Sequence, residues 1–307
     1  MSDGATAGRL VVTGANGNLG RALVRRLVAE GRAVRCLVRS ERAADVLRRL
    51  AVPPEVVVID WRDAEGLARA TTGCEALVHL VGILKESPGA RYRDAHEDTA
   101  RALAAAAKRS GFRRVVYLSI LGARPDSPNA CLASKGRAEA ILLESPLATT
   151  VLRVPMVLGD GDPATQVLRA RARATWVLLT RGGASLEQPI DADDVVEAIV
   201  SALSRPELIG RALDLAGPES LPHRELVRRA AALAGGRPRI VPIPLPLVRA
   251  FAAFAARWLP RPPLTPAMLG VLEHDDRIDP APTCRALGIE LTPLDDTLRR
   301  CLAGTAG

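Results

Sequence analysis

The stretch TGANGNLG, residues 13–20, connects an apolar run to a predicted helix over 18–30. Gly14 permits a tight turn, Gly17 allows backbone amides to approach a bound anion, and Gly20 lets the helix pack closely on the strand. The amino terminus of that helix adds partial positive charge. A merely tight turn between a strand and a helix needs one glycine rather than three. The stretch therefore predicts a diphosphate-binding corner.

Short apolar runs alternate with helical patterns through the first half of the chain. Such alternation is typical of βαβ units, in which helices cover both faces of a parallel sheet. The predicted strands lie at 9–14, 33–39, 55–60, 75–82, 113–119 and 149–154. The predicted fold class is therefore α/β, a Rossmann-like doubly wound parallel sheet.

The alternating pattern loosens after about residue 159, where a smaller C-terminal α+β lobe is expected. We predict a nucleotide-binding Rossmann domain at 1–158 and a lobe for a substrate or partner at 159–307. A helix at 191–203 and a strand after it suggest that about 184–217 returns to the main domain.

The net charge of +8 raises the question of nucleic-acid binding. Only Lys85, Lys108 and Lys135 are lysines, so 39 of the 42 basic residues are arginines. The arginines recur singly or in pairs beside Asp and Glu, as they do on solvated helix faces. With three Trp, two Tyr and three Phe, the chain also has few side chains for base stacking. We therefore expect no nucleic-acid partner.

The cysteines show no CxxC spacing, so neither a disulfide framework nor a metal site is expected. No secretory start is visible, and the longest apolar run, 240–259, is interrupted by prolines and arginines. These features favour a cytoplasmic protein without a transmembrane segment. Peripheral contact at the inner membrane face stays open.

The second predicted strand ends in LVRSER, where an NAD-specific site would carry Asp or Glu. A carboxylate repels a 2′-phosphate, whereas the Arg39 guanidinium can bind it at two points. We therefore predict NADP(H) in preference to NAD(H). The alternative is that Arg39 is one more surface arginine.

The ends of the third and fourth strands supply further predicted contacts, since ligands bind at the carboxyl edge of such sheets. Asp60 could accept a hydrogen bond from the adenine amino group, and Val81 and Gly82 could line the adenosine side. The predicted cofactor residues in these segments are Gly14, Asn16, Gly17, Asn18, Leu19, Gly20, Arg39, Ser40, Asp60, Trp61, Val81 and Gly82.

The order of motifs from residue 9 to 302 resembles that of extended or atypical short-chain dehydrogenase/reductases. The subgroup it is most similar to comprises NmrA-like proteins and bacterial relatives of the nucleotide-binding accessory subunit of respiratory complex I. The resemblance rests on TGANGNLG, LVHLVGI, DAHEDTARAL, VVYLSILGA, SK, LRVPMVLGDGD and QPIDADDV, and on the C-terminal PLPLVRAF and LGIELTPLDDTLRRCL.

The resemblance implies a catalytic serine, tyrosine and lysine. Ser119 matches the serine, which polarises the substrate carbonyl, and Lys135 matches the lysine, which binds the nicotinamide ribose. The tyrosine, four residues before the lysine, is replaced by Cys131. A thiol there shares the helix face with Lys135 but has a shorter reach. Loss of a positioned proton donor typically costs about 10²–10⁴ in rate.

Other matching positions have weaker implications. Pro155, next to the lobe, is expected near the nicotinamide, together with Arg153. His96 stands where many extended members carry Asn. The segment expected to close the cleft contains Gln188, Pro189, Asp191 and Asp194.

Three functions remain open on these grounds. The first is an NADP(H)-binding oxidoreductase, with weak or atypical reduction of an apolar carbonyl substrate, and retention of Ser119 and Lys135 favours it. The second is a non-catalytic accessory or assembly subunit or redox sensor, which Cys131 favours. A nucleotide-sugar epimerase or dehydratase ranks third because it requires the tyrosine.

An apolar stripe on a predicted helix in the C-terminal part of the chain is a candidate contact surface. Leu247, Phe251, Phe254 and Trp258 fall on one side of a predicted helix that starts near Pro246. Packing on the lobe is the simpler interpretation, and a substrate-pocket wall or a membrane or respiratory-complex contact is the alternative. A homodimer is expected only by analogy with relatives.

Overall fold

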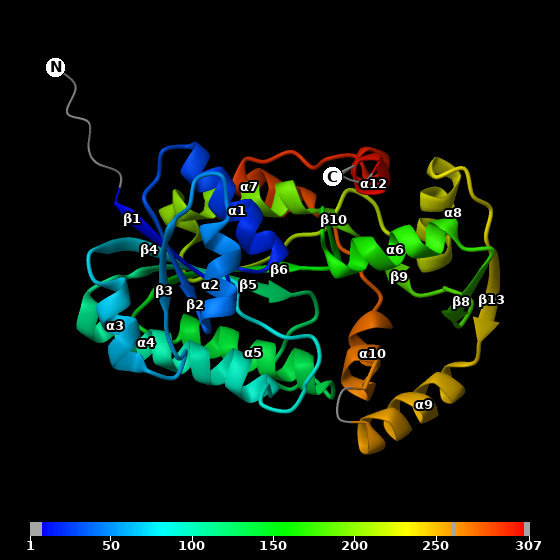
Figure 1. Ribbon diagram of the computed structural model, residues 1–307, viewed down its shortest axis with the longest axis horizontal. Helices are drawn as coiled ribbons and strands as arrows, with labels where there is room; N and C mark the ends of the chain where they lie inside the picture. Colours follow the sequence, from blue (N-terminus) through cyan, green and yellow to red (C-terminus); the bar gives the residue numbers. More distant parts are fainter. Residues whose placement is uncertain (1–7, 260–261, 304–307) are drawn as a thin grey trace.

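The computed structural model describes residues 8–259 and 262–303. Its centre is a seven-stranded parallel sheet with strand order β11-β6-β5-β4-β1-β2-β3 (Figure 1). The strands are β1 (Arg9–Thr13), β2 (Val34–Val38), β3 (Glu55–Val58), β4 (Cys74–His79), β5 (Arg114–Ile120), β6 (Ala148–Val154) and β11 (Ala212–Asp214). This arrangement confirms the predicted doubly wound α/β fold.

Two layers of helices bury the sheet, which explains why its central strands are apolar on both faces. One face is covered by α1 (Asn18–Ala29), α2 (Glu41–Arg48) and α7 (Ala192–Leu203), with α11 (Ala281–Leu287) beside α7. The other face is covered by α3 (Ala64–Thr71), α4 (Thr99–Ser110) and α5 (Ala130–Leu143). A π-helical segment, Arg93–Asp98, leads into α4.

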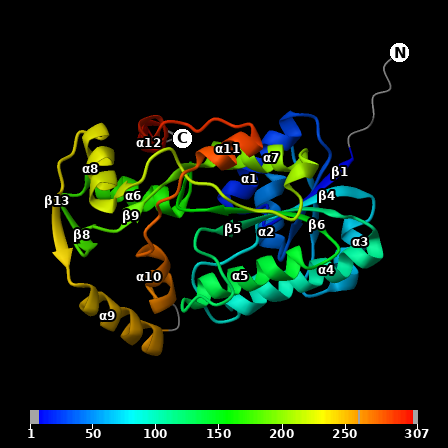
Figure 2. The same cartoon turned by 180° about the vertical axis from the view of Figure 1, so that it is seen from behind.

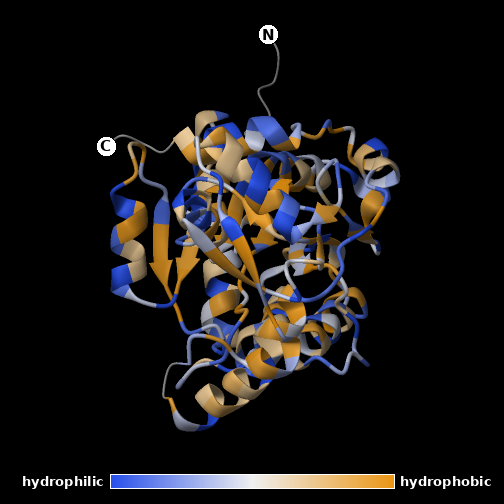
Figure 3. Ribbon diagram, turned by 90° about the vertical axis from the view of Figure 1, so that its right-hand side faces the viewer, coloured by the Kyte–Doolittle hydropathy of each residue, from blue (hydrophilic) through white to orange (hydrophobic). Residues whose placement is uncertain are grey.

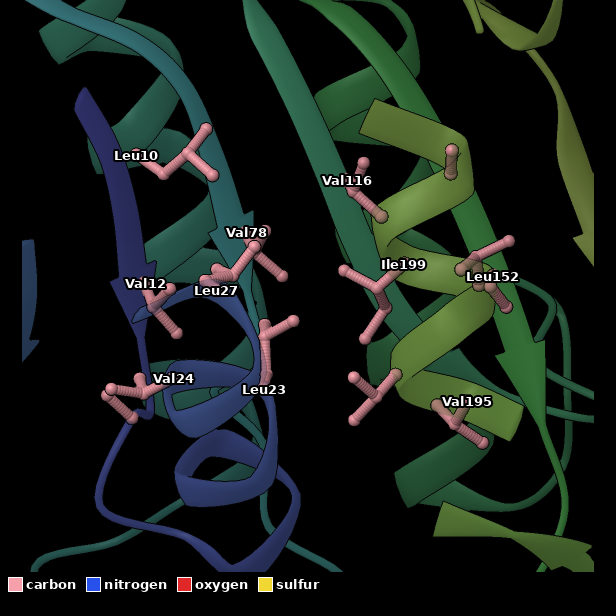
Figure 4. Packing of buried hydrophobic residues seen from close by; sticks show 14 of the residues in the cluster. Leu10, Val12, Leu23, Val24, Leu27, Val78, Val116, Leu152, Val195 and Ile199 are labelled. Atoms are coloured by element: carbon pink, nitrogen blue, oxygen red, sulfur yellow. The ribbon is translucent and has the colours of Figure 1, made fainter. Parts of the chain in front are cut away.

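The first of these cores is shown in Figure 4. Leu23, Val24 and Leu27 of α1 pack beside β1 and β4, and their spacing places them on one helix face. Ile199 of α7 lies over Leu152 of β6 in the same way. Burying one such side chain typically contributes about 1.5–3 kcal/mol.

The smaller lobe has a core of its own around Leu168, Val177, Leu226 and Leu298. Figure 2 shows it, from behind, at the far end of the molecule from α3 (Ala64–Thr71). Its elements are α6 (Pro163–Arg173), β8 (Trp176–Thr180), α8 (His223–Leu233), β13 (Arg239–Ile243), α9 (Leu245–Trp258), α10 (Pro266–Leu272) and α12 (Leu294–Ala303). Strands β8 and β13 are parallel partners.

The chain passes between the two parts more than once. Strand β7 (Val157–Leu158) pairs with β10 (Ile190–Asp191), and β9 (Leu186–Glu187) pairs with β12 (Leu221–Pro222). Downstream of the lobe's first helix, α7 packs on the main sheet and β11 joins it, and Leu287 and Ile289 belong to its core. The boundary between the two predicted domains stays a prediction.

The longest described helices have 14 residues. No helix in the part of the chain that the structure describes is long and apolar enough to cross a membrane.

Replacing Leu152 by Ala tests the core between β6 and α7. Leu152 is fully buried, so the variant loses its transfer free energy and leaves a cavity. We expect urea unfolding to show a loss of about 2–5 kcal/mol. The control, Val52→Ala, changes a side chain that is 61% exposed and should cost less than about 0.5 kcal/mol. Equal losses in both variants would contradict this account of the core.

Candidate functional site

The glycine corner joins β1 to α1 through backbone contacts that leave no room for side chains. Gly14 has a φ of +71°, and a Cβ there would lie 3.0 Å from the carbonyl carbon of Leu80. At Gly20 a Cβ would lie 2.5 Å from the carbonyl oxygen of Gly14. These contacts hold the amino terminus of α1 at the carboxyl edge of the sheet.

The first turn of α1 is free to bind an anion. Gly17 is the N-cap residue, and no side chain caps this end. The first turn has no acidic residue, and the first amides of a helix lack intrahelical acceptors. The dipole and the amides therefore point at the groove outside the sheet.

A cavity of about 290 Å³ lies in front of this corner. Its lining residues are Gly14, Asn16, Gly17, Arg39, Ser40, Ala43, Trp61, Leu80, Val81 and Gly82. Only Ala43 and Leu80 are outside the set expected from the sequence. The structure thus brings together residues from the ends of β1, β2, β3 and β4.

Three predicted cofactor residues have structural contacts as well. The Asn18 amide donates to the carbonyl oxygen of Gly161 at 2.6 Å, and its side-chain oxygen accepts from Arg21 at 2.6 Å. Leu19 packs against the main core, and Gly20 provides the close contact described above. The side chains of Asn18 and Leu19 are therefore directed at the protein, and Gly20 has none, so only the backbone amides of these three residues remain for a ligand.

Arg39, at the end of β2, is exposed and faces a neighbouring cavity of about 390 Å³ that also contains Asp60, Trp61 and Arg62. Its side chain forms no hydrogen bond or ion pair with another described residue. Asp60 is held by the Arg62 guanidinium at 3.1 and 3.2 Å, and this bond lowers the pKa of the Asp60 carboxyl. Ser40 caps α2 by accepting from the Ala43 amide at 3.3 Å.

Lys135 lies on α5, a helix that begins after the cap residue Asn129. Its buried ammonium donates to the Tyr117 hydroxyl at 3.0 Å and to the carbonyl oxygen of Leu118 at 2.8 Å. A Cβ on Gly82 would lie 3.1 Å from Nζ. Burial lowers the pKa of Lys135 to about 8. Since an ammonium has three N–H bonds, one remains for a ligand beside Gly82.

Tyr117 is a site residue that sequence reasoning missed. Its position two residues before Ser119 places both side chains on one face of β5. Its contact with Lys135, which packs from α5 onto that face, could not be read from sequence spacing. The Tyr117 ring is fully buried and stacks on His79 at 5.4 Å, and burial raises the pKa of its hydroxyl.

Ser119 is turned toward an ion pair. Its hydroxyl donates to the Glu139 carboxylate, which Arg153 binds at 2.6 and 3.0 Å. Both Ser119 and Glu139 are buried. The Ser119 hydroxyl therefore donates its proton to Glu139, although Ser119 lines the cavity next to Lys135.

Cys131 lines the same cavity, one helical turn before Lys135. Its thiol lies 3.7 Å from the carbonyl oxygen of Ile83, and burial raises its pKa to about 11. His96 accepts from the Ile83 amide at 3.1 Å through Nε2, and burial lowers its pKa to about 3. At neutral pH both groups are therefore uncharged.

The cavity that holds Lys135, Cys131 and Ser119 has a volume of about 420 Å³ and meets the groove of the glycine corner at Leu80 and Gly82. Most of its wall is apolar. The apolar lining residues include Leu80, Ile83, Leu84, Leu118, Ile120, Leu121, Val154, Pro155, Met156, Val157, Val271 and Leu272.

A second cavity of about 390 Å³ adjoins it inside the lobe. Leu84, Met156, Pro163, Ala164, Glu187 and Leu272 line both cavities. Its polar wall is a chain of contacts, in which Arg171 donates to His223 Nε2 at 2.6 Å and His223 Nδ1 lies 2.9 Å from Glu187. Because arginine only donates, the His223 proton is on Nδ1 and is donated to Glu187.

The segment expected to close the cleft has a structural role instead. Gln188 bonds Gly217 and Ile278, and Asp194 accepts from the backbone and side chain of Thr292 at 2.8 and 2.7 Å. Asp191 caps α7 by accepting from the Asp193 amide. None of these residues lines the two cavities, and they fasten the C-terminal segment to the main domain.

Comparison with known proteins places these features in context. A family model described as NAD(P)H-binding matches residues 14–206. Ceramide reductase of Caulobacter vibrioides is 30% identical over 251 residues, which cover 82% of this chain and 78% of that protein. Mitochondrial NADH dehydrogenase [ubiquinone] 1 alpha subcomplex subunit 9 of Arabidopsis thaliana is 30% identical over 79% of this chain and 62% of that one.

Solved structures share the fold. UDP-N-acetylglucosamine 4-epimerase from Bacillus cereus superposes with a TM-score of 0.73 at 16% identity, covering 98% of this chain and all of that one. At this identity the likeness concerns the fold alone.

The buried lysine predicts a pH effect on stability. The pKa of Lys135 is about 8 in the folded protein and about 10.5 when exposed, so the unfolded chain keeps the proton between these values and stability rises with pH there. Relative to Lys135→Met, wild type should therefore gain about 2 kcal/mol between pH 7 and pH 9.5 in urea unfolding. Lys108→Met, on the exposed side of α4, is the control. A wild-type to Lys135→Met difference that does not vary with pH would argue against a desolvated ammonium.

Proposed function

This chain belongs to the NAD(P)H-binding family, as an NmrA-like, oxidoreductase-like member of the extended short-chain dehydrogenase/reductases, and from that premise we propose that it is an NADP(H)-dependent reductase of an apolar carbonyl compound. One observation carries the proposal. The Lys135 ammonium lies in the wall of an apolar cavity that meets the glycine-lined groove at Leu80 and Gly82.

The groove fits a dinucleotide. The amino terminus of α1 would receive the diphosphate, because its amides are uncapped and no Cβ obstructs Gly14 or Gly17. The adenosine would lie toward Trp61, which lines both cavities on that side. The nicotinamide would lie toward Lys135 and Pro155, where the bound cofactor supplies a hydride.

The preference for NADP(H) rests on Arg39. Its guanidinium is exposed at the adenosine end and is not engaged by any described carboxylate, so it can bind a 2′-phosphate. Two carboxylates line the neighbouring cavity, and one of them, Asp60, is already paired with Arg62, whereas the other, Asp94, belongs to the π-helical segment.

Two residues compete for the role of proton donor. Lys135 has a pKa of about 8 and Cys131 one of about 11. Three units correspond to about 4 kcal/mol in acidity, so the ammonium is the stronger acid. Lys135 would hold the proton at Nζ and donate it to a carbonyl oxygen in the cavity, and Tyr117 would orient the ammonium through the 3.0 Å bond.

A second function, that of a non-catalytic nucleotide-binding accessory subunit, is favoured by Ser119. Its proton is committed to the pair of Glu139 and Arg153, which leaves a carbonyl without the usual serine donor. The plant relative is, by its name, a subunit of NADH dehydrogenase. Bound nucleotide would then stabilise the fold, by about 2.7 kcal/mol at 100 times its Kd.

Calorimetric titration of both dinucleotides tests the cofactor preference. Arg39→Ala should weaken NADPH binding about 10- to 100-fold, the range expected for a lost charge-assisted bond, and leave NADH binding unchanged. Arg49→Ala removes an equal charge from the exposed end of α2 and serves as the control. Unchanged NADPH affinity in Arg39→Ala would remove the argument for a 2′-phosphate site.

Turnover tests the proton route. NADPH oxidation is followed with long-chain aldehydes, ketones, enones and quinones. We expect Lys135→Met to lower kcat at least about 100-fold, Tyr117→Phe to lower it about tenfold, and Cys131→Ser to change it less than about threefold. Because the acid form of Lys135 is required, kcat should fall as the pH rises through about 8.

The variants also separate the alternatives. A loss in Cys131→Ser as large as that in Lys135→Met would assign the proton to the thiol. Tight NADPH binding with no turnover of any compound would favour the accessory subunit.

A further inference from the structure

Helix α9 presents a row of large apolar side chains to solvent. Leu247, Phe251, Phe254 and Trp258, here called the α9 face, are 63%, 53%, 62% and 69% exposed. Their spacing places them on one side of the helix. The helix buries only Ala252 and Ala255, on a neighbouring side of the helix, and packs mainly on α10. Packing on the lobe, the simpler sequence interpretation of this stripe, is therefore wrong for these four residues.

The α9 face is comparable in area to the largest apolar patch on a typical monomer. Aromatic side chains have about 150–250 Å² each, so the four residues expose on the order of 400 Å². Helix α9 lies at the lower edge of the molecule in Figure 3, coloured mostly toward the hydrophobic end. The largest apolar patch on a typical monomer has about this size and is often functional.

Exposed apolar side chains also occur on the two-stranded sheet that precedes α9 in the chain, where β13 ends two residues before α9 begins. Trp176 and Leu178 of β8 are 56% and 57% exposed. The Arg239 guanidinium of β13 lies 5.2 Å from the Trp176 ring centre. On α9 itself, Arg257 lies 5.9 Å from the ring centre of Trp258. Tryptophan beside arginine is typical of side chains at the boundary between lipid and water.

The sequence around α9 carries basic residues and no acidic ones. Residues 226–272 contain seven arginines and no Asp, Glu or Lys. Two of the arginines lie on α9: Arg257 is next to the apolar row on the helical wheel, and Arg249 is on the other side of the helix. Apolar and aromatic side chains flanked by arginines match a helix that lies in the interface of an anionic bilayer.

We propose that the α9 face binds the surface of an anionic lipid bilayer. The complementary charge selects this occupant over a second copy of the chain, since two such surfaces would bring their arginines together. Membrane contact is one of the alternatives that the sequence leaves open for this stripe, and it is the one adopted in this proposal.

Some exposed residues of the lobe also line the lobe cavity, so a bound membrane surface and the cavity would lie close together. Val167, Leu178 and Leu272 are exposed and also line the lobe cavity, which continues toward Lys135. Met268 and Leu269 of α10, the helix on which α9 packs, form another part of its wall. A lipid-soluble substrate could therefore enter from the bilayer without crossing water. This route rests on the proposed function, whereas the docking of α9 does not.

Vesicle co-sedimentation of the full chain tests the proposal without cofactor or substrate. Wild type should bind vesicles of equal parts phosphatidylglycerol and phosphatidylcholine, and should bind phosphatidylcholine vesicles at least about tenfold more weakly. Binding should weaken between about 0.1 M and 1 M salt, because salt screens the arginines. Phe254→Ser/Trp258→Ser should lower the affinity at least about tenfold. Arg249→Gln/Arg257→Gln should reduce both the affinity and its salt dependence.

The matched control is Val52→Ser/Ile209→Ser, which removes apolar side chains that are 61% and 41% exposed away from α9. It should bind as wild type does, and thermal unfolding should show that every variant is folded. Absence of wild-type binding to the anionic vesicles, or equal binding by Phe254→Ser/Trp258→Ser, overturns the proposal. So does a wild-type dimer in light scattering that Phe254→Ser/Trp258→Ser dissociates, if vesicles are not bound. Vesicle binding without any turnover would retain the docking and refute only the reductase.

Discussion

The lack of side chains at Gly14 and Gly20 is the constraint on which the rest of the structure depends. A Cβ at Gly14 would meet the backbone of Leu80 at 3.0 Å, and one at Gly20 would meet the Gly14 carbonyl at 2.5 Å. Through these contacts β1, β4 and α1 come close enough for the helix terminus to face the carboxyl edge of the sheet. The position of the anion-binding amides is therefore a consequence of packing.

The other end of the groove is organised by a buried cation. Removing the Lys135 ammonium from water lowers its pKa to about 8, while Tyr117 and the Leu118 carbonyl hold it in place. Glu139 does not pair with Lys135, because Arg153 and Ser119 occupy its oxygens. Its lowered pKa makes the ammonium a stronger acid than an exposed lysine. The same packing holds the Ser119 hydroxyl in a hydrogen bond to Glu139.

The cavities of the lobe and the α9 face are both mostly apolar. Two adjoining cavities with mostly apolar walls lead from Lys135 to side chains that remain exposed on β8 and α10, next to the α9 face. An apolar ligand and an apolar docking surface are consistent with each other, because both avoid water for the same physical reason. On the proposal made above, the arginines of residues 226–272 would favour negatively charged lipid at this surface.

The sequence by itself determined the sheet, its alternation with helices and the glycine corner, because these depend on local periodicity and on residues adjacent in the chain. It also placed eight of the residues around the corner cavity, since parallel strands end at one edge. Only the tertiary structure decided the contacts between distant segments. It joined Tyr117 to Lys135 and committed Ser119 to Glu139 and Arg153, and it left α9 exposed. Such contacts depend on how a helix rotates and packs against a strand, which sequence spacing does not encode.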